Sequence, residues 1–153
     1  MARMSYSDLT EGRIFDLGSV RIEKDDMLDF NARFDPQPFH LDEEAGRASI
    51  LGGLCASGWY TVALWMRAYV DTVLAGSTSL GSPGGRDIRW PRAVYPGDTL
   101  DMRLEIVSAR VSRSKPDMGL VDLTGTSWRG EELVLSLTFT GFFGVLGGAG
   151  AAG

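Results

Sequence analysis

The sequence predicts an α+β fold in which an antiparallel, curved sheet wraps around one central hydrophobic helix. Residues 50–66 contain no charged side chain, and they open a segment whose composition suits a core helix. From residue 86 onward, apolar and polar residues alternate with a period of two, which is typical of strands with one buried face. One early helix followed by several strands and short turns indicates the α+β class.

The first half of the chain predicts one strand and three helices. In the first of these helices, Phe30, Asn31 and Phe34 follow Met27 at the three-, four- and seven-residue spacing of one helical face. The uncharged stretch approaches the length of a membrane span, but it holds glycines and hydroxyl residues and is bounded by Arg47 and Arg67. We therefore expect a core helix that is apolar on every side. The expected elements are a strand at 13–22 and helices at 23–34, 42–48 and from Gly53 or Leu54 to about Leu74.

The second half predicts strands separated by turns. Alternation is clearest between Leu100 and Ile106, where apolar residues alternate with charged ones. Proline and glycine mark residues 82–85 as a loop. Residues 1–143 then form a single domain with the outline of a hotdog fold, and residues 144–153 form a Gly/Ala-rich tail that we expect to be disordered. The expected strands are 86–90, 99–110, 119–129 and 133–143.

Composition excludes several classes of protein. A net charge of −5 over 153 residues argues against a general nucleic-acid binder. The single cysteine, Cys55, cannot form an internal disulfide, and the chain has no Cys/His spacing typical of a zinc site, so no metal is expected. The N-terminus lacks an apolar signal region, which predicts a cytoplasmic protein without a membrane anchor.

The segment from Phe34 to Asp42 carries the strongest chemical signal. It contains the chain's one histidine, His40, five positions after Asp35, with two prolines between them. Proline fixes its own φ and disfavours helix in the preceding residue, so residues 35–38 are expected to be stiff and non-helical. A turn near Phe39 would aim the carboxylate and the imidazole at one water molecule, as general acid–base chemistry requires. The alternative is an ordinary surface histidine next to a helix capped by Asp42.

This segment resembles the MaoC-like, (R)-specific enoyl-CoA hydratase family. The family motif is Asp-x-Asn-Pro-(aliphatic)-His, followed by a His-Gly or Gly-Gly step that opens the central helix. Here it reads Asp35-Pro36-Gln37-Pro38-Phe39-His40, with Gly52-Gly53 as the later step, and residues 95–100 are similar to the family's Pro-Gly-Asp-Thr-Leu turn. Gln37 and Phe39 depart from the motif, which affects how the loop is held and the shape of the pocket.

The resemblance implies a hydratase that acts on an enoyl-CoA, with coenzyme A as part of the substrate and no separate cofactor. Asp35 would take a proton from water, and His40 would orient that water and protonate Cα of the substrate. The backbone at Gly53 and Leu54 would bind the thioester oxygen at a helix N-terminus, with Thr61 near the site. The resemblance also implies a homodimer or a dimer of dimers. Arg86, Arg89 and Arg92 are candidates for coenzyme A phosphate contacts, or else they form a solvated strand face.

Two other functions remain open at this point. A hotdog thioesterase would use a carboxylate base without needing His40, and a non-catalytic subunit would bind acyl-CoA without converting it.

The aromatic residues of the central helix favour a core role over an acyl pocket. They are Trp59, Tyr60, Trp65 and Tyr69.

Overall fold

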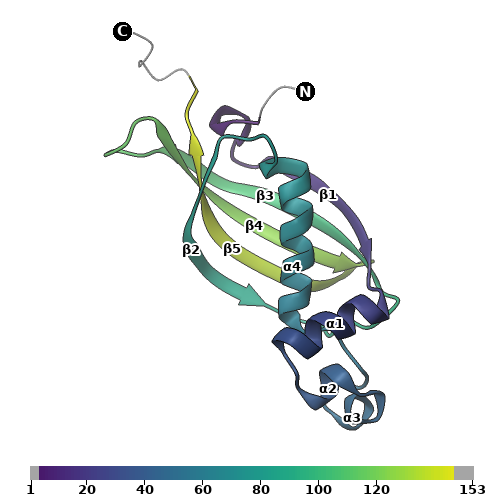
Figure 1. Ribbon diagram of the computed structural model, residues 1–153. Coiled ribbons are helices and arrows are strands. Elements are labelled where there is room, and N and C mark those ends of the chain that lie inside the picture. Colours follow the sequence, from purple (N-terminus) through teal and green to yellow (C-terminus); the bar gives the residue numbers. More distant parts are fainter. Residues whose placement is uncertain (1–3, 147–153) are drawn as a thin grey trace.

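A five-stranded antiparallel sheet curves around one central helix, α4, in the computed structural model, which describes residues 4–146 (Figure 1). The strand order is β1-β3-β4-β5-β2, so β1 and β2 form the two edges. Helices α1, α2 and α3 lie together beyond one end of α4. The predicted α+β architecture is confirmed. The elements are a 3-10 turn (Tyr6–Asp8), β1 (Ile14–Arg21), α1 (Lys24–Phe34), α2 (Pro38–Leu41), α3 (Glu43–Ala48), α4 (Gly58–Tyr69), a π-helical segment (Val70–Leu74), β2 (Ser79–Arg89), β3 (Thr99–Val111), β4 (Met118–Arg129) and β5 (Glu132–Gly144).

The core lies between α4 and the concave face of the sheet. The alternation predicted for β3 is confirmed, since the apolar residues from Leu100 to Ile106 are buried and their neighbours are exposed. On α4, Trp65 and Tyr69 face the sheet and pack against Phe139 of β5. Side chains buried on both sides of this interface exclude water from it, which is the main stabilising contribution to such a fold.

Gly125 of β4 provides the space for the largest of these side chains. A Cβ atom at this position would lie 2.5 Å from Cε2 of Trp65, whose indole is buried and donates a hydrogen bond to the carbonyl of Arg103. We expect Gly125→Ala to lower the free energy of unfolding by about 1–3 kcal/mol, because the indole cannot move without disturbing the core. Chemical denaturation measures this change. Thr124→Val, on the opposite face of β4, should cost about 0.5 kcal/mol or less, and equal losses would contradict the packing argument.

The prediction for the start of the central helix is wrong. Helix α4 begins at Gly58 instead of Gly53 or Leu54, and its cap is Ser57, whose Oγ accepts a hydrogen bond from the Trp59 N–H. Gly52 has a φ of 72°, so it turns the chain, and the residues from Gly53 to Ser57 are not helical. Backbone hydrogen bonds from Cys55 to Phe39 and from Ala56 to Val94 hold this non-helical segment. These long-range bonds prevent the helix from starting earlier.

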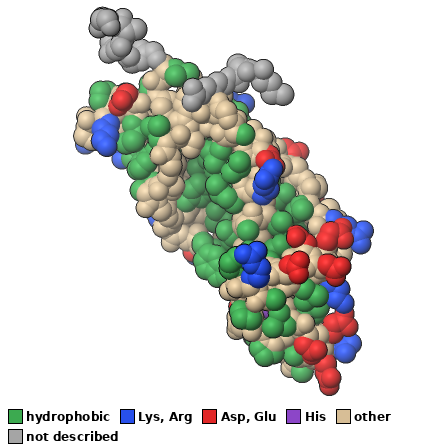
Figure 2. All heavy atoms as spheres, in the orientation of Figure 1, with side chains coloured by type: hydrophobic (Ala, Val, Ile, Leu, Met, Phe, Trp, Pro, Cys, Tyr) green, Lys and Arg blue, Asp and Glu red, His purple; other side chains and the backbone are tan. Residues whose placement is uncertain are grey.

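Helix α4 is also not covered by other elements on every side, which was the expectation for a core helix that is apolar all round. Trp59 is 54% exposed and Met66 is 43% exposed, because one face of α4 points away from the sheet. Figure 2 shows hydrophobic side chains along this part of the surface, whereas acidic side chains gather over α1 and α3. The described part of the chain has no helix with the length and apolar character needed to span a membrane.

Three further expectations need correction. Residues 82–85 are part of β2, where Gly81 and Gly84 adopt positive φ beside the irregular pairing with β5, and the Ser82 hydroxyl donates to the Thr140 carbonyl. Pro38 is the first residue of α2, a position where a helix tolerates proline. At the other end of the chain, Gly144 still belongs to β5, and the rest of the expected tail from residue 147 lies outside the described residues.

Candidate active site

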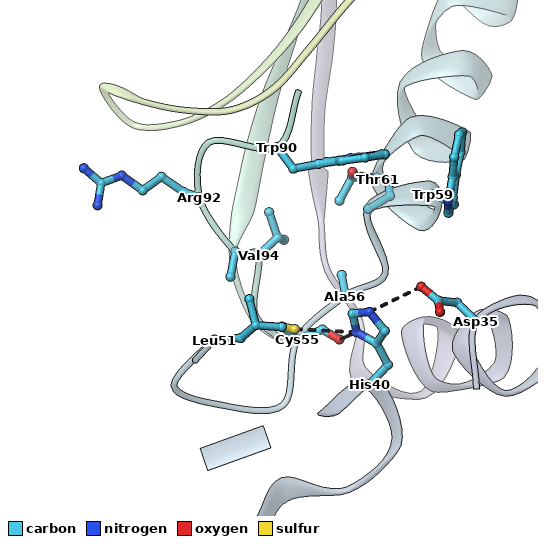
Figure 3. A pocket seen from close by; sticks show the side chains of 12 residues that line it. Asp35, His40, Leu51, Cys55, Ala56, Trp59, Thr61, Trp90, Arg92 and Val94 are labelled. Atoms are coloured by element: carbon cyan, nitrogen blue, oxygen red, sulfur yellow. Dashed lines mark hydrogen bonds and ion pairs between the residues drawn. The ribbon is translucent and has the colours of Figure 1, made fainter. Parts of the chain in front are cut away.

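A cavity of about 230 Å³ opens between the N-terminal end of α4 and the segments that carry Asp35 and His40 (Figure 3). Its lining is mostly apolar, so a small number of polar groups can fix the orientation of a ligand. Trp90, which follows β2, covers one side, and the His40 ring lies on the opposite side. The lining residues are Asp35, His40, Leu51, Cys55, Ala56, Gly58, Trp59, Thr61, Trp90, Arg92, Ala93 and Val94.

Asp35 and His40 meet at this cavity, as the sequence predicted. Asp35 caps the C-terminus of α1, and the short helix α2 turns the chain so that His40 faces back toward it. Nε2 of His40 lies 3.3 Å from Oδ2 of Asp35. The two side chains are only 8% and 17% exposed, so their interaction is weakly screened by solvent.

The backbone fixes the tautomer of His40. Nδ1 lies 2.9 Å from the carbonyl oxygen of Cys55, and a carbonyl can only accept a hydrogen bond. Nδ1 therefore carries a proton, and Nε2 is the nitrogen that exchanges protons on the side of Asp35. The Cys55 thiol lies beside the same ring, and burial, together with the Asp35 carboxylate, raises the pKa of this thiol. Cys55 is therefore a neutral neighbour of the pair at pH 7.

The Asp35 carboxylate is held by donors on both oxygens. Gln37 Nε2 donates to Oδ1 at 2.6 Å, and Ser57 Oγ donates to Oδ2 at 2.7 Å. Burial raises the pKa of Asp35, but these hydrogen bonds and the nearby His40 outweigh it, so the pKa lies below its usual value. Asp35 is thus ionised at neutral pH. It stabilises the folded protein above its unfolded pKa, and this contribution is lost as the pH falls through the folded value.

Asn31 of α1 joins the two segments that carry the site. Its side chain is fully buried, and its amide donates to the carbonyls of His40 and Cys55 at 2.8 and 3.3 Å. Its oxygen accepts a hydrogen bond from the Ser57 N–H at 3.1 Å. A buried amide satisfied in this way fixes the spacing between segments that are distant in sequence. The sequence indicated only that Asn31 lies on the apolar side of its helix.

The N-terminus of α4 supplies Gly58 to the cavity wall. The first N–H groups of a helix have no partner within the helix and point toward a ligand. Trp90 packs directly on Gly58, and a Cβ atom there would lie 2.5 Å from Nε1 of the indole. Ser57 and Gly58 were missed as site residues, although a serine before an apolar run is a recognised signal for a helix start.

The other predicted site residues are spread over several environments. Thr61 lines the cavity, but its hydroxyl is used in a bond to the Gly58 carbonyl at 2.6 Å. Gly53 and Leu54 are not among the residues that line the cavity, since Gly53 packs against Tyr95 and Leu54 is buried in a separate apolar cluster. Trp59 lines the cavity, whereas Tyr60, Trp65 and Tyr69 are buried as expected.

The three candidate arginines also lie in different environments. Arg86 pairs with Asp122 at 3.3 Å, and Arg89 pairs with Asp87 at 2.7 Å. Of the three, Arg92 alone lines the cavity; its side chain is 68% exposed and its Nε lies 3.9 Å from Oε2 of Glu132. Within residues 4–146 no three His, Cys, Asp or Glu side chains are grouped closely enough to hold a metal ion.

The curved five-stranded antiparallel sheet that wraps around α4 defines a hotdog protein. The chain belongs to the family of MaoC-like domains, whose sequence pattern matches residues 10–126. It is similar to the MaoC-like dehydratase of Rhodospirillum rubrum, with 36% identity, coverage of 92% of this chain and 97% of that one, and a TM-score of 0.84.

Two more distant solved structures share the fold, and one further protein is similar in sequence. The (R)-hydratase PhaJ1 of Pseudomonas aeruginosa is 20% identical, with 93% of this chain and 86% of that one covered and a TM-score of 0.69. A Mycobacterium tuberculosis protein with a double hotdog fold is 22% identical, with a TM-score of 0.76, and this chain spans 47% of it. The uncharacterized protein YdeM of Bacillus subtilis is 26% identical over 130 residues, which are 85% of this chain and 91% of that one.

Proposed function

We propose that the protein catalyses the reversible hydration of a 2-enoyl-CoA to an (R)-3-hydroxyacyl-CoA. The observation that carries this proposal is the contact between Asp35 and His40 on the wall of a mostly apolar cavity that the N-terminus of α4 also lines. A carboxylate and an imidazole that share one small space can move both protons of a single water molecule. Relatives of the same fold named as (R)-hydratases support this reaction class.

The proposed reaction balances its protons within the pair. It begins with ionised Asp35 beside His40 protonated on both nitrogens. Asp35 takes a proton from water as the water oxygen adds to Cβ of the substrate, and His40 Nε2 gives its proton to Cα. The proton on Asp35 then returns to Nε2 across the 3.3 Å gap, which restores the starting state. No redox or metal cofactor takes part in this cycle.

The thioester oxygen becomes negatively charged as Cβ is attacked, and it needs a donor. We propose the Gly58 N–H for this role in place of the N–H of Gly53, because Gly58 is the first residue of α4 and lines the cavity. Arg92 at the rim of the cavity is the candidate for a coenzyme A phosphate. Arg86 and Arg89 are less suited to it, since neither lines the cavity.

An assay with crotonyl-, octenoyl- and branched enoyl-CoA tests this proposal. We expect the enoyl absorbance to fall with at least one substrate, with no free thiol released and only the (R)-hydroxyacyl product formed. Release of thiol would indicate a thioesterase. Binding of acyl-CoA without loss of absorbance across all chain lengths would indicate a non-catalytic subunit.

We further propose that the chain acts as a homodimer that pairs along β2. This edge strand has unpaired backbone groups on its outer side, and all its residues are exposed in the isolated chain. The apolar side chains Leu80 of β2 and Met66 of α4 are exposed nearby. Light scattering at micromolar concentration should give a dimeric or tetrameric mass, and Leu80→Asp should reduce it. A monomeric mass for the unmodified protein would contradict this arrangement.

A further inference from the structure

Ser57 is a buried hydroxyl that touches two parts of the site at once. Its side chain is fully inaccessible to solvent. Its Oγ accepts a hydrogen bond from the Trp59 N–H at 3.3 Å and lies 2.7 Å from Oδ2 of Asp35. An ionised carboxylate cannot donate, so the single hydroxyl proton must point to Asp35. The orientation of this hydroxyl is therefore fixed.

We propose that Ser57 is a positioning residue that holds the Asp35 carboxylate beside His40 and couples it to the N-terminus of α4. This inference rests on the proposed hydration, in which Asp35 is the base and the N-terminus of α4 binds the thioester oxygen. Gln37 holds Oδ1 of Asp35, and Ser57 and His40 share Oδ2. With donors on both oxygens, the carboxylate cannot rotate away from the cavity.

The backbone of Ser57 is held without the hydroxyl. Its N–H donates to Asn31 Oδ1 at 3.1 Å, and its carbonyl accepts hydrogen bonds from the N–H groups of Tyr60 and Thr61. Removal of the hydroxyl should therefore leave the chain path intact. The effect is confined to the carboxylate and to one cap bond of α4.

Removal of the Ser57 hydroxyl should raise the pKa of Asp35. The titratable side chains that share the cavity with Asp35 are His40 on α2, Cys55 before α4 and Arg92 after β2. None of them is altered when the Ser57 hydroxyl is removed. Loss of a donor to the ionised form raises the pKa of a carboxyl group, so Asp35 should titrate at higher pH in a variant without this hydroxyl.

The test compares Ser57→Ala and Ser57→Gly with the unmodified protein. Because a hydrogen bond to a charged group is lost, we expect kcat for crotonyl-CoA hydration to fall by about tenfold to a hundredfold. KM should change by about twofold or less, since Ser57 touches no substrate in the proposed site. Carbon-13 NMR of the free protein should show the Asp35 carboxyl titrating at higher pH. Glycine tolerates the cap position well, so Ser57→Gly should fold even if the alanine variant does not.

Asp42→Ala is the matched control, since Asp42 caps α3 by accepting the Ala45 N–H at 2.8 Å and does not line the cavity. It should lower the melting temperature by about as much as Ser57→Ala does, because both variants lose a helix cap, but it should not change kcat. An unchanged kcat in both Ser57 variants, or an equal loss of kcat in Asp42→Ala, would overturn the inference. If the unmodified protein hydrates no enoyl-CoA, the proposed function fails. The NMR titration then still decides whether Ser57 controls Asp35, because an unshifted titration overturns that claim.

Discussion

Asp35→Asn and His40→Ala are each expected to lower kcat/KM for enoyl-CoA hydration by at least about a hundredfold. Asn is nearly the same shape as Asp, so the loss in Asp35→Asn is a loss of the base and not of packing. His40→Ala removes the proposed proton donor to Cα, which is also the group that takes the proton back from Asp35 across the 3.3 Å gap. Steady-state hydration rates with the best substrate measure both effects.

The double variant should be little worse than the poorer single variant. In the proposed mechanism both side chains act on one water molecule in one transition state, so removal of either should disable the same step. A double variant whose loss equals the product of the two single losses would indicate that the residues act in separate steps.

Asp122→Asn is a control for the loss of a hydrogen-bonded carboxylate. Asp122 accepts hydrogen bonds from Thr140, Ser108 and Arg86, and it is not among the residues that line the cavity. We expect it to affect stability but not kcat/KM. If His40→Ala keeps near-normal hydration while Asp35→Asn is inactive, the pair mechanism is wrong, and an enzyme with a single catalytic carboxylate is the better interpretation.

The fold could be predicted because its strongest signals are local. Alternation in β3 reflects one buried face, and the periodic apolar residues of α1 reflect one helical stripe that packs on its neighbours. Turns at proline and glycine then marked the ends of most of the strands. The misassigned residues 82–85 show the limit of this approach, because Pro83 and two positive-φ glycines are accommodated in an irregular edge strand.

The site was predicted in part for the same reason. Asp35 and His40 are close in sequence, and the prolines between them limit the paths of the loop, so their meeting followed from local rules. The position of the α4 N-terminus did not, because it depends on hydrogen bonds from Cys55 to Phe39 and from Ala56 to Val94. Asn31, whose amide spans 24 residues to reach Cys55, could not be assigned its role from periodicity alone.

Gly58→Ala is expected to lower kcat/KM by about a hundredfold, although the variant keeps the backbone N–H that we propose as the oxyanion donor. A Cβ atom at this position would lie 2.5 Å from Nε1 and 2.8 Å from Cδ2 of Trp90, so the indole must move. Trp90 lines the cavity and packs edge-on against Trp59 with ring centroids 5.4 Å apart. A displacement of about 1 Å at a site wall is enough for a loss of this size.

The loss in Gly58→Ala should depend on Trp90, and a double-mutant cycle tests this. In a Trp90→Ala background the added methyl group meets no indole, so Gly58→Ala should then cost about threefold or less. Trp90 is 41% exposed, so both single variants should fold, and circular dichroism checks this. If Gly58→Ala costs the same factor in both backgrounds, the effect comes from the backbone at the start of α4 and not from displacement of the indole. Full activity of Gly58→Ala would show that the Trp90 wall can shift without disturbing the bound substrate.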